Sequence, residues 1–226
     1  MEGKEIERKF LVNTFPRNNL VEEFSLIQGY ISIDPEIRIS KSITVSTDYK
    51  VSISHSLSIK SNGDLFRDEI KIRISDHAFN KLSDFIKGKF IFKIGQANMI
   101  RDHHISSAIV YMNSKEILKY SEVEFDNISA AKNFKWPIKT IKAKDITYNP
   151  EYKMKNIWNK HHDKIENKYI YYGAFYQDLS KMIKKLSENR TTDGIYIKPI
   201  LRESINELVK QYKMYGMILN KPERRD

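Results

Sequence analysis

Three charged side chains near the start of the chain, Glu5, Glu7 and Lys9, stand at every second position. In an extended strand alternate residues point to the same face, so these three would share one face and Ile6 and Phe10 the other. Carboxylates beside an ammonium group can bind a divalent cation and a phosphate together, because Mg²⁺ and Mn²⁺ prefer oxygen ligands and phosphates pair with cations. This spacing therefore points to chemistry on a phosphorylated molecule, provided that other strands repeat it.

The same alternation recurs along the first two thirds of the chain. Segments such as "EIRIS" and "FRDEIKIRI" place charged residues on one face and isoleucines on the other. The charged face gains Arg38, Lys60, Arg67, Glu69, Lys71, Arg73, Lys93, Glu122, Glu124 and Asp145. Six or more short strands of this kind are typical of a mainly antiparallel sheet or barrel.

Two segments have helical periodicity instead and can cover the apolar faces. Residues 75–88 start with an N-cap candidate, Ser75 or Asp76, and end at Gly88, and residues 127–134 fit a shorter helix. If these helices lie outside the sheet, the charged faces turn inward and line a water-filled tunnel. The alternative is a sandwich or open sheet whose charged faces are simply solvated.

The last third of the chain has a different pattern. Two apolar stripes at helical spacing are separated by the turn-forming segment "NRTTDGIYIKP". We therefore expect a domain at residues 1–156 and a helical hairpin at 157–226 that packs on it. The hairpin could also contact a protein partner or form a homodimer.

The composition indicates where in the cell the protein works and which kind of partner it binds. The chain has 226 residues, a net charge of +10 and no cysteine, which excludes disulfides, thiolate metal sites and cysteine nucleophiles. It lacks an apolar run long enough to cross a bilayer and an apolar signal core, so we expect a cytoplasmic protein without membrane contact. The positive charge favours an anionic partner.

A cavity that combines cations with carboxylates suits phosphoryl transfer, most simply hydrolysis. A divalent ion held by the carboxylates neutralises charge on the phosphoryl group, while lysine and arginine stabilise the transition state. This reaction class follows from the residue types alone and does not specify the substrate.

The segment "EIERKFLV" resembles the N-terminal Glu-x-Glu-x-Lys signature of the CYTH, or triphosphate tunnel metalloenzyme, superfamily. The resemblance continues in order through "IQGYIS", "EIRIS", "LSIKSNG", "SEVEF" and "DITYNPEYKMKN", and it spans residues 1–156. It implies an α+β fold, in which an eight-stranded antiparallel β-barrel with covering helices encloses a tunnel. It also implies that the tunnel binds a triphosphate with Mg²⁺ or Mn²⁺.

The resemblance implies roles for individual residues. Metal-binding positions are matched by Glu5, Glu7, Glu69, Glu122 and Glu124, and the strand pattern adds Asp145. Phosphate-binding positions are matched by Lys9, Arg38, Lys60, Arg67 and Lys93, and Arg73 or Arg101 could replace a missing cation. We expect Lys9 and Lys93 to take part in catalysis.

The chain also departs from the family pattern. Ser40 and Gly95 stand where a second cation usually follows Arg38 and Lys93, and Lys71 stands where a glutamate usually follows Glu69. Residues 41–56 look like an insertion, and residues 95–118 fit the pattern poorly.

The resemblance implies metal-dependent hydrolysis of inorganic triphosphate or a small organic triphosphate. Two alternatives remain open: an adenylate cyclase of the class IV type, and a non-catalytic module that binds a nucleotide or polyphosphate. Nucleic acid is not an expected partner, apart from an RNA 5′ triphosphate as a further substrate.

Overall fold

The structure, a computed structural model, describes residues 2–48, 50–86, 90–112 and 115–161. The strands are β1 (Glu2–Val12), β2 (Leu20–Ile33), β3 (Glu36–Ser46), β4 (Val51–Lys60), β5 (Phe66–Arg73), β6 (Ile91–Ile100), β7 (His103–Met112), β8 (Lys115–Glu124) and β9 (Ala143–Asp145). The helices are α1 (Asp76–Ser83), α2 (Ile128–Asn133), the 3₁₀ turn η1 (Pro150–Tyr152) and α3 (Met154–His161).

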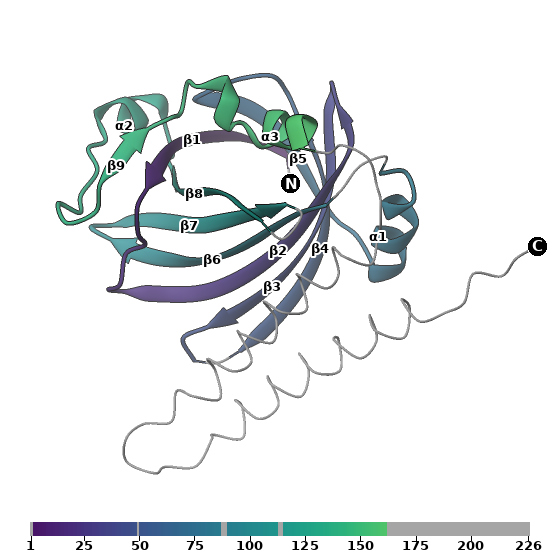
Figure 1. The fold of residues 1–226 in the computed structure, drawn as a ribbon, viewed down its shortest axis with the longest axis horizontal. Helices are drawn as coiled ribbons and strands as arrows, with labels where there is room; N and C mark the ends of the chain where they lie inside the picture. The colour runs from purple at the N-terminus through teal and green to yellow at the C-terminus, as the bar shows by residue number, and fades with distance from the viewer. Residues whose placement is uncertain (1, 49, 87–89, 113–114, 162–226) are drawn as a thin grey trace, which may run out of the picture.

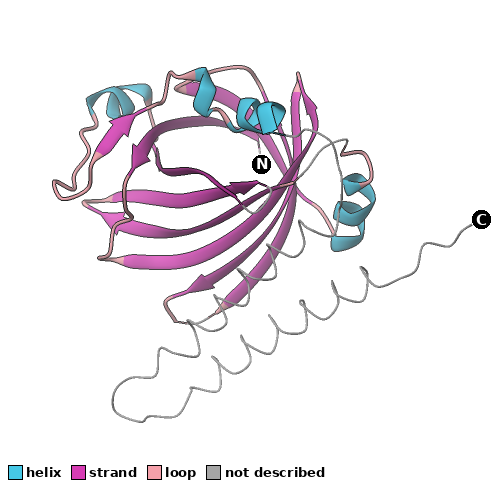
Figure 2. Cartoon of the chain, in the orientation of Figure 1, coloured by secondary structure: helices cyan, strands magenta, loops and turns pink. Residues whose placement is uncertain are grey.

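The first eight strands form a closed antiparallel barrel (Figures 1 and 2). Neighbouring strands follow the order β5, β4, β3, β2, β6, β7, β8, β1, and β1 also pairs with β5, which closes the ring. The short strand β9 adds to the far end of β1. This arrangement confirms the predicted eight-stranded barrel, because the strands have no free edge along most of their length.

The apolar residues of β1 point out of the barrel, as the alternation predicts. Phe10 is buried against Phe134, which follows α2, and Ile6 packs with Ala131 of α2. On the opposite side, Phe79 of α1 covers the outer face of β3. Outer apolar faces are thus shielded by helices, and the charged faces of the same strands turn inward.

The helix α1 begins where its sequence predicts. The Ser75 hydroxyl accepts a hydrogen bond from the backbone N–H of Ala78, which satisfies one of the free donors at the helix start. Asn127 caps α2 in the same way through Ala130.

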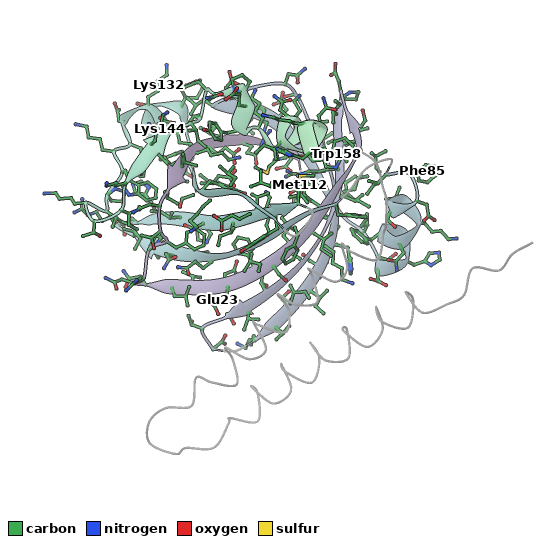
Figure 3. All side chains as sticks on the ribbon, viewed as in Figure 1. Glu23, Phe85, Met112, Lys132, Lys144 and Trp158 are labelled. Carbon is green, nitrogen blue, oxygen red and sulfur yellow. The ribbon has the colours of Figure 1, made fainter. Side chains whose placement is uncertain are left out.

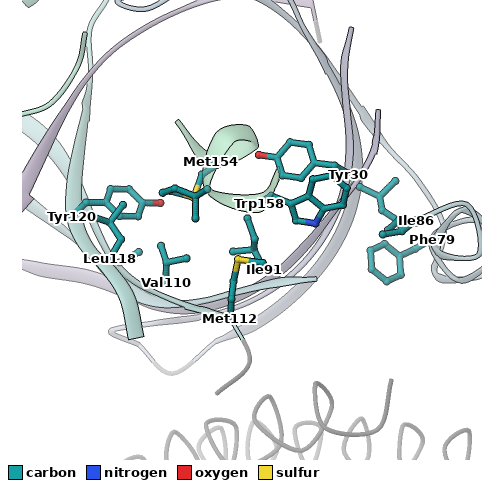
Figure 4. Close-up of a cluster of buried hydrophobic side chains, with 13 residues drawn as sticks. Tyr30, Phe79, Ile86, Ile91, Val110, Met112, Leu118, Tyr120, Met154 and Trp158 are labelled. Carbon is teal, nitrogen blue, oxygen red and sulfur yellow. The ribbon is translucent and has the colours of Figure 1, made fainter. Parts of the chain in front are cut away.

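The helix α3 fills one end of the barrel interior with apolar side chains (Figure 4). Met154 and Trp158 point into the barrel, and the indole ring of Trp158 lies 5.3 Å from the ring of Tyr30. Tyr120 and Val110 of the barrel wall belong to the same buried cluster. The interior is therefore apolar at this end, and the charged side chains lie beside it.

The strand arrangement shows how two unusual segments are built. Residues 41–45 of β3 pair with residues 51–55 of β4 in continuous register, so the segment interpreted as an insertion lengthens this hairpin. Residues 95–112 and 115–118, which fit the family pattern poorly, belong to β6, β7, β8 and the turn between β6 and β7, with a shift in register between Val110 and Tyr111.

The predicted boundary after residue 156 falls inside α3. The helical hairpin predicted within 157–226 lies beyond residue 161, outside the described residues, so the hairpin and its roles in a homodimer or with a partner stay predictions. Among the described residues, none of the helices is both long and apolar enough to cross a membrane.

Candidate active site in the barrel interior

The charged inner faces line a cavity of about 220 Å³ inside the barrel. Its cationic side chains are Lys9, Arg38, Lys60, Arg67, Lys71, Lys93 and Lys153. Its acidic side chains are Glu5, Glu7, Glu36, Glu69, Glu122, Glu124 and Asp64. The segment from Ile146 to Met154, which leads into α3, lines the same cavity.

Glu5 is held by two cations from neighbouring strands. Lys60 Nζ lies 2.7 Å from each carboxylate oxygen, and Arg67, the register partner of Glu5 on β5, donates through Nε at 2.5 Å. Burial alone would raise the pKa of this carboxyl, but the charges of Lys60 and Arg67 lower it to about 2. Glu5 therefore stays ionised and is already neutralised by its partners.

Glu7 lies two residues along the same face and has a different environment. Arg67 reaches it with a second nitrogen at 3.1 Å, and Glu124 is its register partner on β8. Burial, followed by the nearby charges of Glu122 and Glu5, raises the pKa of Glu7 to about 7. Glu7 thus carries negative charge that its surroundings do not fully balance.

Lys9 and Glu122 face each other across the β1–β8 ladder. Their ion pair is 2.7 Å long, and Lys9 Nζ lies 4.6 Å from the centre of the Tyr120 ring. The backbone N–H of Lys9 donates to the hydroxyl of Thr147, which ties β1 to the segment that covers the cavity. Burial would raise the pKa of Glu122, but the charges of Lys9 and Lys93 lower it.

Lys93 is a buried cation with a neutral hydrogen-bond partner. Its Nζ donates a hydrogen bond of 2.9 Å to the hydroxyl of Tyr120. Burial lowers the pKa of Lys93 to about 7, even though the charge of Glu122 favours the ammonium form. Near neutral pH a substantial fraction of this amine is therefore uncharged and can accept a proton.

Arg38 occupies the opposite wall beside Tyr30 and Glu36. Burial opposes its charge, but the charges of Tyr30 and Glu36 raise its pKa above the ordinary value. Glu36 is 5% exposed, lines the cavity and lies 3.8 Å from Arg67. The sequence reasoning missed Glu36, although it precedes Arg38 by two residues and so shares its face.

The same alternation could have identified Tyr120, which precedes Glu122 by two residues. Its hydroxyl group and ring contact Lys93 and Lys9. The cavity residues Thr147 and Lys153 had no such signal, because they come from irregular backbone and from a turn outside the strand pattern.

Two of the predicted site residues lie away from the cavity lining. Arg73 is an exposed residue at the end of β5. Asp145 forms an ion pair with Arg8, whose guanidinium group also donates to two backbone carbonyls of the α2 region. Since Arg8 and the neighbouring Phe10 belong to the outer face, the structure gives Asp145 a structural contact in place of the expected position in the tunnel.

The two positions that lack the expected cation are filled by neutral groups. The hydroxyl of Ser40 lies 2.8 Å from that of Ser56. A side chain at Gly95 would place its Cβ atom 2.1 Å from the carbonyl oxygen of Ser107 and 2.5 Å from the ring of Phe24. No side chain fits at Gly95 in this packing, so Phe24 has taken the space that a cation would need.

Hard oxygen donors suitable for Mg²⁺ or Mn²⁺ are abundant here. One buried oxygen of Glu69 accepts no hydrogen bond from the described residues, although Lys60 Nζ lies 3.3 Å away. Within the described ranges, no three acidic or histidine side chains yet converge on one point. The donor chemistry therefore fits a divalent ion, and the carboxylates of Glu7, Glu122 and Glu124, together with those of Glu5 and Glu69, are the candidates to hold it.

Comparison with known proteins supports the family assignment. An inorganic triphosphatase of Nitrosomonas europaea is 30% identical over 133 residues, which cover 58% of this chain and 82% of the relative. The chain belongs to the CYTH, or triphosphate tunnel metalloenzyme, superfamily. No protein-family model matches the sequence.

Two solved structures are similar to this chain at lower sequence identity. A crystal structure of an inorganic triphosphatase has 26% sequence identity and a TM-score of 0.47, covering 68% of this chain and 93% of its own. A Bacillus halodurans protein, assigned provisionally as an adenylate cyclase, has 11% identity and a TM-score of 0.38, covering 58% of this chain and 85% of its own.

Proposed function

We propose that this CYTH protein hydrolyses a triphosphate, inorganic or carrying a small organic group, with the help of a divalent metal ion. The observation that carries the proposal is the convergence of the Glu5, Glu7 and Lys9 signature with Arg38, Lys60, Arg67 and Lys93 in one enclosed cavity. The inorganic triphosphatase of Nitrosomonas europaea supports the reaction class.

The charge balance of the cavity supports metal dependence. Seven cationic and seven acidic side chains line it, so the lining as a whole offers a triphosphate little net attraction. A divalent cation changes this balance and also reduces the repulsion around Glu7 that raises its pKa. Binding of metal and of triphosphate should therefore reinforce each other.

The residues of the cavity have different roles in this proposal. Arg38, Lys60 and Arg67 bind phosphate oxygens, and the fork of each arginine can make two parallel hydrogen bonds. The divalent ion would be held by the carboxylates of Glu7, Glu122 and Glu124, and when bound it neutralises charge on the phosphoryl group.

Lys93 is the group placed to move a proton. Its amine is partly neutral near pH 7 and hydrogen-bonded to Tyr120, so it can accept a proton from an attacking water. Lys9 stays beside Glu122 and can stabilise negative charge on the transferred group.

A non-catalytic binding module is the second candidate function. The neutral positions Ser40 and Gly95 favour it, because each lost charge-assisted contact weakens the grip on the transferring phosphate. Such a module would bind triphosphate under any divalent metal without releasing phosphate.

The test is an assay of purified protein with inorganic triphosphate, ATP and thiamine triphosphate, each with Mg²⁺ or Mn²⁺. We expect phosphate release, and a loss of about 100-fold or more in Glu7→Gln. The matched control is Glu116→Gln, which changes an exposed glutamate of β8. Binding without release would support the non-catalytic module, and cyclic AMP among the products would identify a cyclase.

We propose that this activity takes place in the cytoplasm, the location expected from the sequence. An RNA 5′ triphosphate remains a further candidate substrate, and the same phosphate-release assay can include it.

A further inference from the structure

A second cavity lies outside the tunnel, where three connections between elements meet. It has a volume of about 690 Å³ and shares no lining residue with the charged cavity. Its lining comes from residues 14–19 between β1 and β2, from Ile100 and Arg101 at the β6–β7 turn, and from residues 137–141. Figure 1 shows these connections on the side of the barrel that carries α2 and β9. We call this cavity the loop groove.

Apolar side chains join the lining of the loop groove to the interior of the protein. Phe15, Ile100 and Ile138 line the groove and pack against the buried cluster that contains Phe10. Ile141, which is 7% exposed, belongs to that cluster and also lines the groove. A cavity of this volume with apolar walls and a few polar groups is typical of a binding site for a small organic molecule.

Three cationic side chains also line the loop groove, one from each connection: Arg17, Arg101 and Lys139. All three are exposed, and none of them forms an ion pair with another residue that the structure describes. No aspartate or glutamate is found among the described residues of this lining, whereas acidic side chains balance the cations of the tunnel. The loop groove therefore offers uncompensated positive charge beside apolar surface.

The backbone of Arg101 gives a separate indication that its side chain has a role here. Arg101 and Asp102 form the β6–β7 turn with φ angles of 48° and 64°. A turn with two positive φ angles favours Asn, Asp or Gly, so Asp102 suits its position and Arg101 does not. The arginine that could have supplied a missing cation to the tunnel thus lines the loop groove, at a position where asparagine would fold more easily.

Hydrogen bonds from β6 hold the β1–β2 connection in place. The amide group of Asn98, which is 0% exposed, donates to the carbonyl of Asn18 at 2.8 Å. The amide group of Gln96 donates to the carbonyl of Pro16 at 2.6 Å. Arg17 lies between these two anchored residues, so a ligand would not have to order this connection when it binds.

From these features we infer that the loop groove binds a small organic anion. Its phosphate or carboxylate group would pair with Arg17, Arg101 and Lys139, and its apolar body would pack on Phe15 and Ile138. The planar forks of the two arginines match the oxygens of either anion. Since no carboxylate lines the described part of the groove, this binding needs no metal ion. The inference does not depend on the proposed triphosphate hydrolysis.

The experiment measures binding to the full chain by calorimetry in a chelator, which keeps divalent ions out of the tunnel. The probes are 1-naphthyl phosphate, 1-naphthoate, neutral 1-naphthol and inorganic phosphate. We expect one saturable site for a naphthyl anion, and binding of 1-naphthol and of inorganic phosphate that is weaker by about tenfold or more, because each lacks one half of the ligand. The tighter of the two naphthyl anions distinguishes a phosphate ligand from a carboxylate ligand.

The variant Arg17→Gln/Arg101→Asn removes two of the cations and suits the turn. It should weaken binding of the naphthyl anion by about tenfold or more. Arg101→Asn alone should raise the midpoint of thermal unfolding by about 1–3 °C, because asparagine tolerates a positive φ angle. The matched control is Arg73→Gln/Lys81→Gln, which removes two exposed cations of β5 and α1 and should change the affinity less than about twofold.

Three results would overturn the inference. They are no saturable binding of either naphthyl anion to wild type, unchanged affinity in folded Arg17→Gln/Arg101→Asn, and an equal loss of affinity in the control variant. Glu7→Gln should bind the naphthyl anion as wild type does, and loss of binding in this variant would place the probe in the tunnel and also overturn the inference. Binding in the groove without phosphate release from triphosphate would support the inference and contradict only the proposed hydrolysis.

Discussion

At the scale of single residues, two glutamates on one strand face have opposite electrostatic surroundings. Glu5 contacts two cations and keeps a pKa of about 2, whereas Glu7 shares one arginine with Glu5, lies near Glu122 and has a pKa of about 7. Both carboxyls are buried, so the difference comes from the surrounding strands: β4 and β5 supply Lys60 and Arg67 to Glu5, and β8 places the carboxylate of Glu122 near Glu7.

This difference predicts a pH dependence of stability in the metal-free protein. The folded pKa of Glu7 lies above its ordinary value of 4.5, so its contribution to stability is complete below about pH 4.5 and is lost as the pH rises through 7. Between these limits the free energy of unfolding of wild type should fall by about 3 kcal/mol relative to Glu7→Gln. Denaturant unfolding at several pH values measures this difference, and parallel curves for the two proteins would contradict it.

The role of Lys93 can be tested with two replacements. Lys93→Met removes the amine, and Lys93→Arg keeps a permanent positive charge. If a neutral amine accepts the proton, kcat should fall by about 100-fold or more in both variants while KM changes much less. High activity in Lys93→Arg would show that Lys93 supplies only charge.

At the scale of elements, the close packing of β2, β6 and β7 explains why glycine stands at position 95. Gly95 of β6 faces Phe24 of β2 and a backbone carbonyl of β7 at distances that leave no room for a Cβ atom. Phe24 therefore fills the space beside Gly95, a position where the family resemblance implies a cation, and this makes the wall neutral there.

We predict that Gly95→Ala lowers the free energy of unfolding by about 2–3 kcal/mol, because backbone and ring must move. The control is Gly3→Ala on β1, where nothing lies within 4 Å of the added atom and the change should stay within about 0.5 kcal/mol. Urea unfolding of the two variants measures the contrast, and equal effects would show that the wall is not tightly packed there.

Strand alternation made most of the barrel wall predictable from sequence. Glu5, Glu7 and Lys9 stand at spacings that any strand enforces, so their common face could be predicted without coordinates. The position of the segment from Ile146 to Met154 could not be predicted in this way. Lys153 reaches the cavity from a turn and donates to the carbonyl of Gly63, and this contact depends on how two loops meet. The prediction that Asp145 lies in the tunnel was wrong. Its strand is a short addition to β1, and its side chain pairs with Arg8 on the outer face.

At the scale of the whole molecule, the lining of the tunnel does not account for the positive charge of the chain. The chain carries a net charge of +10, yet the cavity lining holds equal numbers of cationic and acidic groups. Lys132 and Lys144, for example, point away from the barrel near α2 and β9 (Figure 3). The exterior can attract anions from solution, whereas firm binding inside the tunnel requires a further cation.

The most direct test of this account is phosphate release from inorganic triphosphate and ATP, first with a chelator and then with increasing Mg²⁺ or Mn²⁺. The account predicts no release in the chelator, release that saturates with metal, and no recovery in Glu7→Gln at any metal concentration. Equal release with and without the metal, or full activity in Glu7→Gln, would contradict the claim that the carboxylates of this tunnel hold a divalent ion for triphosphate hydrolysis.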